Sequence, residues 1–202
     1  MNKQTQQTKK TIQALKSSFL QLYNQQDIDK ITIKMVTENA GLYRSTFYIH
    51  FNDIFDLLNK IEQEEVEKFQ NYIQNNFENA TMNQFMKLIV DYFNLNGDLL
   101  YLLVHKSKNA NFSENIKHTI VKIITDILGI DLSIDQQNNV KIHFALEYVA
   151  DSFIFLLNFW YHHQNEIEIN ELYPFAMQIL HHGLPSQLTP YVTKNPDIIK
   201  KL

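Results

Sequence analysis

One short run of polar side chains offers the clearest chemistry in this sequence. Arg44 is the only arginine of the chain, and its neighbours carry hydroxyl or imidazole groups: Tyr43, Ser45, Thr46, Tyr48 and His50. A guanidinium can form two parallel hydrogen bonds with O6 and N7 of guanine, which a lysine ammonium cannot do. An isolated arginine is more often a solvated surface residue, so the elements around this run decide its interpretation.

The residues on either side predict two short helices joined at a glycine. Thr32 is placed to cap a helix that ends at about Asn39, Gly41 permits a sharp turn, and residues 43–49 form the second helix. Apolar residues at steps of three and four predict a supporting helix over residues 7–24. The second helix has an apolar back face made of Leu42, Phe47 and Phe51. Such a helix-turn-helix lays its second helix in the major groove of DNA.

The segment ITIKMVTENAGLYRSTFYIHFNDIFDLL, residues 31–58, resembles the helix-turn-helix signature of the TetR family of bacterial transcription regulators. With the preceding helix, the resemblance covers about residues 10–58. The rest of the chain resembles the family loosely, through its helical organisation, Trp160 and Gly183, and is somewhat similar to a branch that contains transcriptional coactivators. The best-matched positions are Thr32, Ala40, Gly41, Thr46, Phe47, Tyr48, His50, Phe51 and Leu57.

The resemblance implies a role for each matched polar side chain. Arg44 and Ser45 would face base edges, with Tyr43 near them. The side chains that would hold phosphates are Thr32, Lys34, Thr46, Tyr48 and His50. The sequence departs from the family at Tyr43, where a small capping residue is usual, and at Ile54, where a phosphate-binding lysine is common. Loss of that lysine predicts weaker DNA binding than in a typical member.

Charge is distributed unevenly along the chain. Residues 1–51 carry seven basic and three acidic side chains, a net charge of +4, whereas residues 52–202 carry eleven basic and nineteen acidic ones, a net charge of −8. A basic first segment followed by an acidic one suggests that only residues 1–51 contact a polyanion. Chance explains a +4 segment equally well, so the motif is the stronger indication.

Composition favours an all-helical intracellular protein. Four glycines and four prolines make about 4% of the 202 residues, against roughly 12% in average proteins, which is too few for sheets or a Rossmann fold. The absence of cysteine excludes disulfides, thiol nucleophiles and Cys-ligated metals. No secretory signal is visible, and the most apolar stretch, residues 153–161, is half a membrane span. We therefore expect a cytoplasmic protein without membrane contact or cofactor.

The glycines at positions 97, 129 and 183 stand where apolar-periodic runs end, so they mark helix boundaries. Capping boxes that begin at Thr81 and Ser133 mark helix starts, and Asn170 can cap the last helix with Pro174 in its first turn. The expected helices beyond the helix-turn-helix cover residues 53–77, 81–95, 98–106, 111–128, 134–162 and 170–182. We expect a DNA-binding head of residues 1–52, an effector-binding and dimerising body of residues 53–184, and an irregular tail of residues 185–202. The helix over residues 53–77 is the one evident link between head and body.

The aromatic residues of the body have two interpretations. At helical spacing they are ordinary core, whereas the family resemblance implies a small-molecule cavity that they would line. The candidate ligand-binding residues are Tyr101, Phe112, Phe144 and Tyr148. We expect the cavity between residues 53–77, 98–106 and 134–162, and aromatic or apolar effectors.

Clusters of ionisable residues point to ordinary structural roles. His143, Glu147 and Asp151 share one helix face and could bind a hard divalent cation, but a polar seam or dimer contact is favoured over a metal site. The histidine pairs at positions 162–163 and 181–182 are placed to meet free carbonyls at helix ends. The acidic run Glu62, Glu64, Glu65 and Glu67 is interpreted as a solvated helix face. No motif for catalysis is present, so the chain is not expected to be an enzyme.

Taken together, the sequence predicts a two-domain, all-helical homodimer that binds a near-palindromic operator and is released by a small molecule. The last two body helices carry apolar residues on more than one face, so they are expected to form a four-helix dimer interface. Those residues include Phe153, Phe155, Leu156, Phe159, Leu172, Phe175 and Leu180. Two alternatives stay open: a coactivator of the same fold that acts through a protein partner, and a helical ligand-binding or catalytic bundle without DNA affinity.

Overall fold

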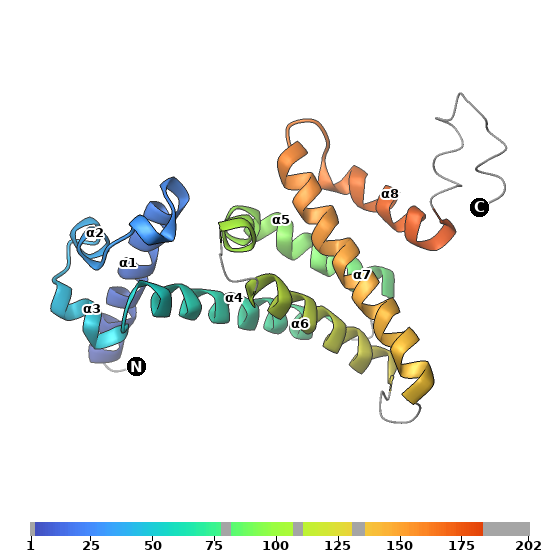
Figure 1. The fold of residues 1–202 in the computed structure, drawn as a ribbon, viewed down its shortest axis with the longest axis horizontal. Helices are drawn as coiled ribbons and strands as arrows, with labels where there is room; N and C mark the ends of the chain where they lie inside the picture. The colour runs from blue at the N-terminus through green and yellow to red at the C-terminus, as the bar shows by residue number, and fades with distance from the viewer. Residues whose placement is uncertain (1–2, 78–81, 107–110, 131–135, 184–202) are drawn as a thin grey trace. The chain divides into compact units, whose positions relative to one another are not determined.

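The computed structural model describes residues 3–77, 82–106, 111–130 and 136–183, and these ranges contain helices and turns but no strand (Figure 1). This confirms the predicted all-helical fold. The long helices of the described ranges bury one apolar face each, so their packing rather than sheet pairing supplies the core. The helices are α1 (Lys3–Gln25), η1 (Ile28–Lys30, a 3-10 turn), α2 (Ile33–Asn39), α3 (Arg44–His50), α4 (Ile54–Asn76), α5 (Met82–Lys106), α6 (Asn111–Leu128), α7 (Gln136–His163) and α8 (Ile169–His182).

The chain divides into two compact units. The first contains residues 1–72 and 102–112, and the second contains residues 73–101 and 113–202. Both α4 and α5 therefore begin in one unit and end in the other. The expectation that the helix over residues 53–77 is the one link between head and body is wrong, because α5 provides a second continuous connection.

The helix-turn-helix of the first unit forms as predicted. The Thr32 hydroxyl accepts a hydrogen bond from the Met35 amide at 3.2 Å and so caps α2. Gly41 has φ of 65°, the left-handed conformation that a glycine adopts without strain. α1 supports this pair from one side (Figure 1), where the Ser18 hydroxyl donates to the Val36 carbonyl at 2.7 Å. The buried apolar residues of these helices are Leu15, Phe19, Tyr23, Val36 and Phe47.

In the second unit, α5 has a kink where the sequence predicts a helix boundary at Gly97. Residues 82–95 and 98–106 belong to one helix with a kink at Asn96, whose φ and ψ are −121° and 15°. The side-chain amide of Asn96 donates to the Tyr92 carbonyl at 2.8 Å, which satisfies a backbone acceptor that the kink would leave free. A Cβ on Gly97 would lie 3.7 Å from the ring of Trp160, so this glycine packs close to Trp160 of α7.

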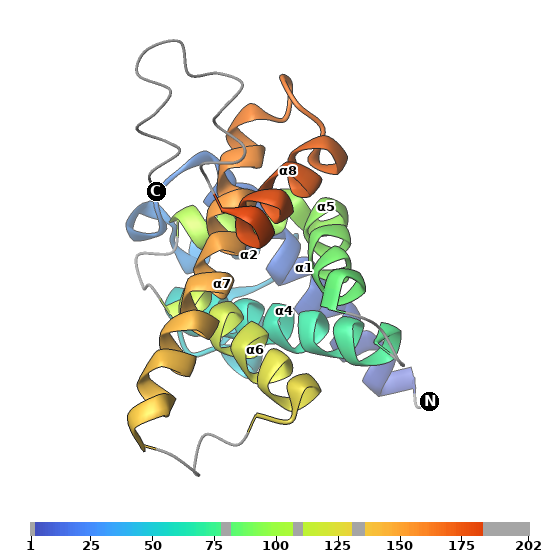
Figure 2. The ribbon, with the colours of Figure 1, turned by 90° about the vertical axis from the view of Figure 1, so that its right-hand side faces the viewer.

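The last two helices, α7 and α8, lie beside each other, as Figures 1 and 2 show. α8 begins at Ile169 after an extended Glu168, so Asn170 is not its cap and Pro174 is the sixth helical residue rather than part of the first turn. The start shifts because Ile169 is buried and the Leu172 amide already donates to the Glu168 carbonyl at 3.1 Å.

The predicted stops at Gly129 and Gly183 are confirmed, and both glycines have positive φ. The capping boxes at Thr81 and Ser133 and the tail of residues 185–202 lie outside the described residues. No helix in the described ranges is both long and apolar enough to cross a membrane.

Candidate functional site

α3 presents a solvent-exposed face opposite its packing face. Phe47 is completely buried and its ring lies 5.5 Å from that of Phe51. On the other side, Arg44 and Ser45 are exposed and Tyr43 is 83% exposed. Tyr48 is exposed as well, whereas Thr46 and His50 are half-buried at the flanks of α3. The structure therefore brings all six predicted residues of this run onto or next to one short helix.

The start and the end of α3 are fixed by different contacts. At the start, the Leu42 amide donates to the Thr37 carbonyl at 2.8 Å, and Tyr43 precedes the helix without a side-chain cap bond. At the end, the Lys60 ammonium donates to the His50 carbonyl at 3.0 Å and lies 5.1 Å from the centre of the Phe51 ring. A cation at the carboxyl end of a helix complements its dipole, so Lys60 stabilises the last turn of α3.

The basic side chains of the first unit differ in their availability to a polyanion. Arg44 has no ion-pair partner among the described residues, and Lys34 has Glu38 at 3.7 Å, a long separation between two exposed groups. Lys9 and Lys10 are also exposed, on α1. Lys16, in contrast, is buried and ion-paired with Glu64, so its charge is neutralised within the protein.

Ile54, which stands where TetR regulators commonly have a phosphate-binding lysine, is buried at the start of α4. Its side chain belongs to the core and cannot contact a phosphate. Thr32, whose oxygen caps α2, retains its hydroxyl proton for donation to an acceptor outside the helix.

The four candidate ligand-binding residues of the body do not converge on one cavity. Phe112 is completely buried, and Phe144 is exposed and stacks on Tyr148 with ring centres 6.2 Å apart. Tyr101 stacks on Tyr161 at 3.6 Å and its hydroxyl lies 3.2 Å from Nε2 of His162. Of the four, Tyr148 alone lines the groove between α7 and α8.

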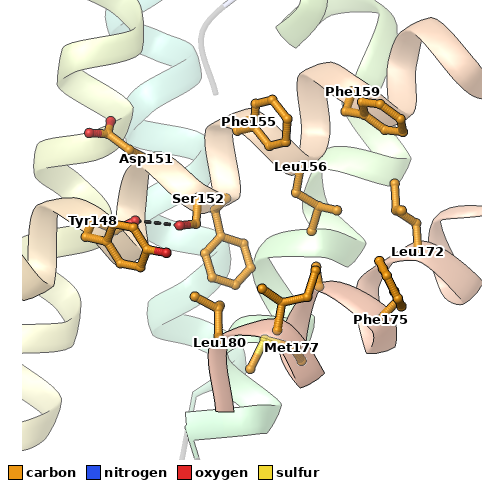
Figure 3. Close-up of a pocket in the computed structure, with 13 residues that line it drawn as sticks. Tyr148, Asp151, Ser152, Phe155, Leu156, Phe159, Leu172, Phe175, Met177 and Leu180 are labelled. Atoms are coloured by element: carbon orange, nitrogen blue, oxygen red, sulfur yellow. Dashed lines mark hydrogen bonds between the residues drawn. The ribbon is translucent and has the colours of Figure 1, made fainter. Parts of the chain in front are cut away.

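That groove has a volume of about 590 Å³ and an almost wholly apolar lining. Figure 3 shows side chains from α7 and α8 facing each other across it. Two of the aromatic residues at its rim are notably solvent-accessible, Phe155 at 69% and Phe159 at 42%. Its principal apolar lining residues are Phe155, Leu156, Phe159, Leu172, Phe175 and Leu180.

The carboxylates considered for a metal site bind a lysine instead. Nζ of Lys117 lies 3.0 Å from Glu147 and 3.7 Å from Asp151, and Glu114 approaches it at 3.1 Å. The hydrogen bond with Glu147 is the main reason that the pKa of Lys117 is raised. Within the described ranges, no three metal-ligating side chains gather at one point. These contacts support the interpretation as a polar seam between α6 and α7.

The interpretation of the acidic run in α4 as a solvated face is wrong for two of its members. Glu62 and Glu65 are buried, the latter only 1% exposed, because they share the face of α4 that also carries Phe69. Glu65 is ion-paired with Lys68 at 2.9 Å. Burial, followed by the nearby charge of Glu62, raises the pKa of Tyr23 to about 12.

Comparison with known proteins shows the fold. No family model and no curated protein matches the chain. The fatty acid degradation regulator FadR from Bacillus halodurans superposes with a TM-score of 0.67 at 14% identity, over 86% of this chain and 96% of that one. A TetR transcriptional regulator from Streptococcus agalactiae gives 0.64 at 22% identity, over 87% and 96%. The regulator FadR from Bacillus subtilis, solved with stearoyl-CoA, gives 0.66 at 14% identity, over 85% and 98%. The chain therefore has the fold of TetR-type regulators.

Proposed function

We propose that this chain is a sequence-specific DNA-binding transcription regulator that acts in the cytoplasm, with residues 1–52 as its DNA-binding domain. The observation that carries the proposal is the exposed polar face of α3, the second helix of a capped helix-turn-helix. Arg44 and Ser45 at its first turn are proposed to contact base edges, with Tyr43 beside them. The proposed phosphate contacts are Thr32, Lys34, Thr46, Tyr48 and His50.

The second part of the proposal is a homodimer formed through α7 and α8. The exposed aromatic rims of the groove between these helices support it, since a second copy of the same surface would cover them. A two-fold dimer presents two copies of α3 at a fixed separation, so the operator would be near-palindromic.

The third part is release from DNA by a small molecule bound within residues 53–184, which makes the protein a repressor. An effector can act only if it binds the DNA-competent and DNA-incompetent states with different affinities. α4 and α5 each run through both units, so they can carry such a change. Because FadR from Bacillus subtilis was solved with stearoyl-CoA, this compound is a suitable first probe for an apolar effector.

A mobility shift with DNA taken from beside the chain's own gene tests the proposal. We expect a discrete complex that survives excess non-specific competitor, and loss of that complex in the Arg44→Ala variant. A protein that binds no DNA, or binds all sequences equally, would contradict the proposal and favour a coactivator or a ligand-binding bundle. Addition of stearoyl-CoA to the complex then tests the effector class separately from DNA binding.

A further inference from the structure

Ile49 occupies an unusual place on α3. Successive residues of an α-helix are about 100° apart around its axis, so Ile49 lies about 160° from Phe47, the residue that anchors the helix in the core. Ile49 is 75% exposed. Ser45 stands one turn before it on the same outward ridge, while Arg44 and Tyr48 flank the ridge on one side.

A large aliphatic side chain at the centre of this otherwise polar face offers an apolar contact to whatever this face binds. The major groove of DNA offers one apolar group, the C5-methyl of thymine, beside donors and acceptors that suit arginine and serine. The charges around Ile49 favour a polyanion over an apolar protein surface, because Arg44 is unpaired among the described residues and the first 51 residues carry a net charge of +4.

We infer that Ile49 is a specificity-determining residue that packs against a thymine methyl group in each operator half-site. This inference rests on the proposed DNA-binding function and deepens it. It assigns an A·T base pair to the same half-site in which Arg44 contacts a guanine. Ile49 carries no hydrogen-bonding group and so is not among the DNA-contacting residues predicted from the sequence, although the helical period places it opposite Phe47.

The test uses the full chain and an operator selected from a random pool of DNA duplexes. Each thymine of the selected operator is then replaced by deoxyuridine, which removes the methyl group and leaves base pairing unchanged. At one position per half-site we expect the affinity of the wild-type protein to fall about fourfold for each methyl group removed, as for loss of one buried methylene. Replacement of the other thymines should have little effect.

The variant Ile49→Ala should bind the thymine operator more weakly and should bind the thymine and deoxyuridine operators equally. The matched control is Leu95→Ala, an equally exposed aliphatic residue on α5, which should keep the thymine preference. Because Ile49 is exposed, its replacement removes no core contact, and an unchanged circular dichroism spectrum would verify the fold.

Two results would overturn the inference while leaving DNA binding intact. The first is a selected operator in which no deoxyuridine substitution weakens binding, and the second is an Ile49→Ala variant that keeps the full preference for thymine. If no sequence is selected at all, the proposed function itself fails and the inference falls with it.

Discussion

At the scale of single residues, Arg44 is expected to supply specificity rather than general affinity. Replacing Arg44 by alanine should reduce operator affinity by about 1 to 3 kcal/mol, because a bidentate contact with guanine is lost. Binding to non-specific DNA should hardly change. Fluorescence anisotropy titrations with both duplexes measure the two effects. Equal losses on both would show that Arg44 contacts only phosphate.

Lys34, in contrast, is expected to contribute general affinity, which is the same for every DNA sequence. Each phosphate contact releases condensed counterions, so Lys34→Ala should flatten the plot of log affinity against log salt by about one unit per subunit. The exposed Lys122 of α6 provides a matched control, and Lys122→Ala should leave the slope unchanged. A slope that Lys34→Ala does not alter would remove Lys34 from the interface.

Tyr23 is expected to make the stability of the protein fall at high pH. Its pKa rises from 10.0 to about 12 on folding, so between these values the native state keeps a proton that the unfolded state releases. The contribution of Tyr23 to the free energy of unfolding is therefore complete below pH 10, and it is lost as the pH rises toward 12. Urea unfolding at pH 8, 10 and 11 should show a smaller loss for Tyr23→Phe than for the wild type. Parallel losses in the two proteins would contradict this assignment.

Residue identity alone predicted exposure well for the polar residues of α3 and badly for Glu62 and Glu65. Carboxylates are rarely buried, since desolvation is costly unless a partner compensates. In α4 that expectation fails because both glutamates lie on the face that carries Phe69, and Glu65 has Lys68 beside it. The helical period contained this signal, and it also places Lys68 one turn after Glu65 as the partner that makes burial tolerable.

At the scale of elements, helix ends were predictable where one residue fixes the local backbone. Thr32 caps α2, and the glycines at 41, 129 and 183 adopt positive φ, all without help from distant residues. Gly97 likewise predicts the boundary between residues 95 and 98, where the structure has a kink at Asn96. Two contacts lie beside this kink: the hydrogen bond from the Asn96 side-chain amide to the Tyr92 carbonyl, and the Trp160 ring near Gly97, from more than sixty residues away in the sequence. The groove between α7 and α8 depends on how two helices pack, which residue periodicity does not specify, and of the four candidate ligand residues it includes Tyr148 alone.

The carboxyl end of α5 is joined to the carboxyl end of α1 by one side chain. Lys106 donates to the Tyr23 and Asn24 carbonyls at 2.8 and 2.7 Å. Hydrogen bonds from a charged group contribute about 1.5 to 3 kcal/mol, so Lys106→Met should destabilise the protein by roughly that amount. Urea unfolding measures the change, with Lys87→Met, an exposed position on the same helix, as the control. Equal stability of the two variants would show that Lys106 contributes no more than a surface lysine.

At the scale of the whole molecule, the surface of α7 and α8 is expected to be covered by a second copy of the chain. A carboxylate introduced at Phe155 would lose water without gaining a partner in such an interface. We therefore expect a dimer at micromolar concentration for the wild type and a monomer for Phe155→Glu. Sedimentation velocity measures this. Leu95→Glu, an exposed apolar position on α5 away from the groove, should remain dimeric.

Dimerisation should in turn decide operator affinity. When two linked copies of α3 engage two half-sites, the second contact forms at high effective concentration, and a monomer loses this advantage. Phe155→Glu should consequently bind the full operator far more weakly than the wild type, yet bind an isolated half-site with similar affinity, since α3 is untouched. Titrations with both duplexes distinguish the two effects. A wild-type monomer at micromolar concentration, or a monomeric Phe155→Glu that binds the full operator as tightly as the wild type, would contradict a dimer built on α7 and α8.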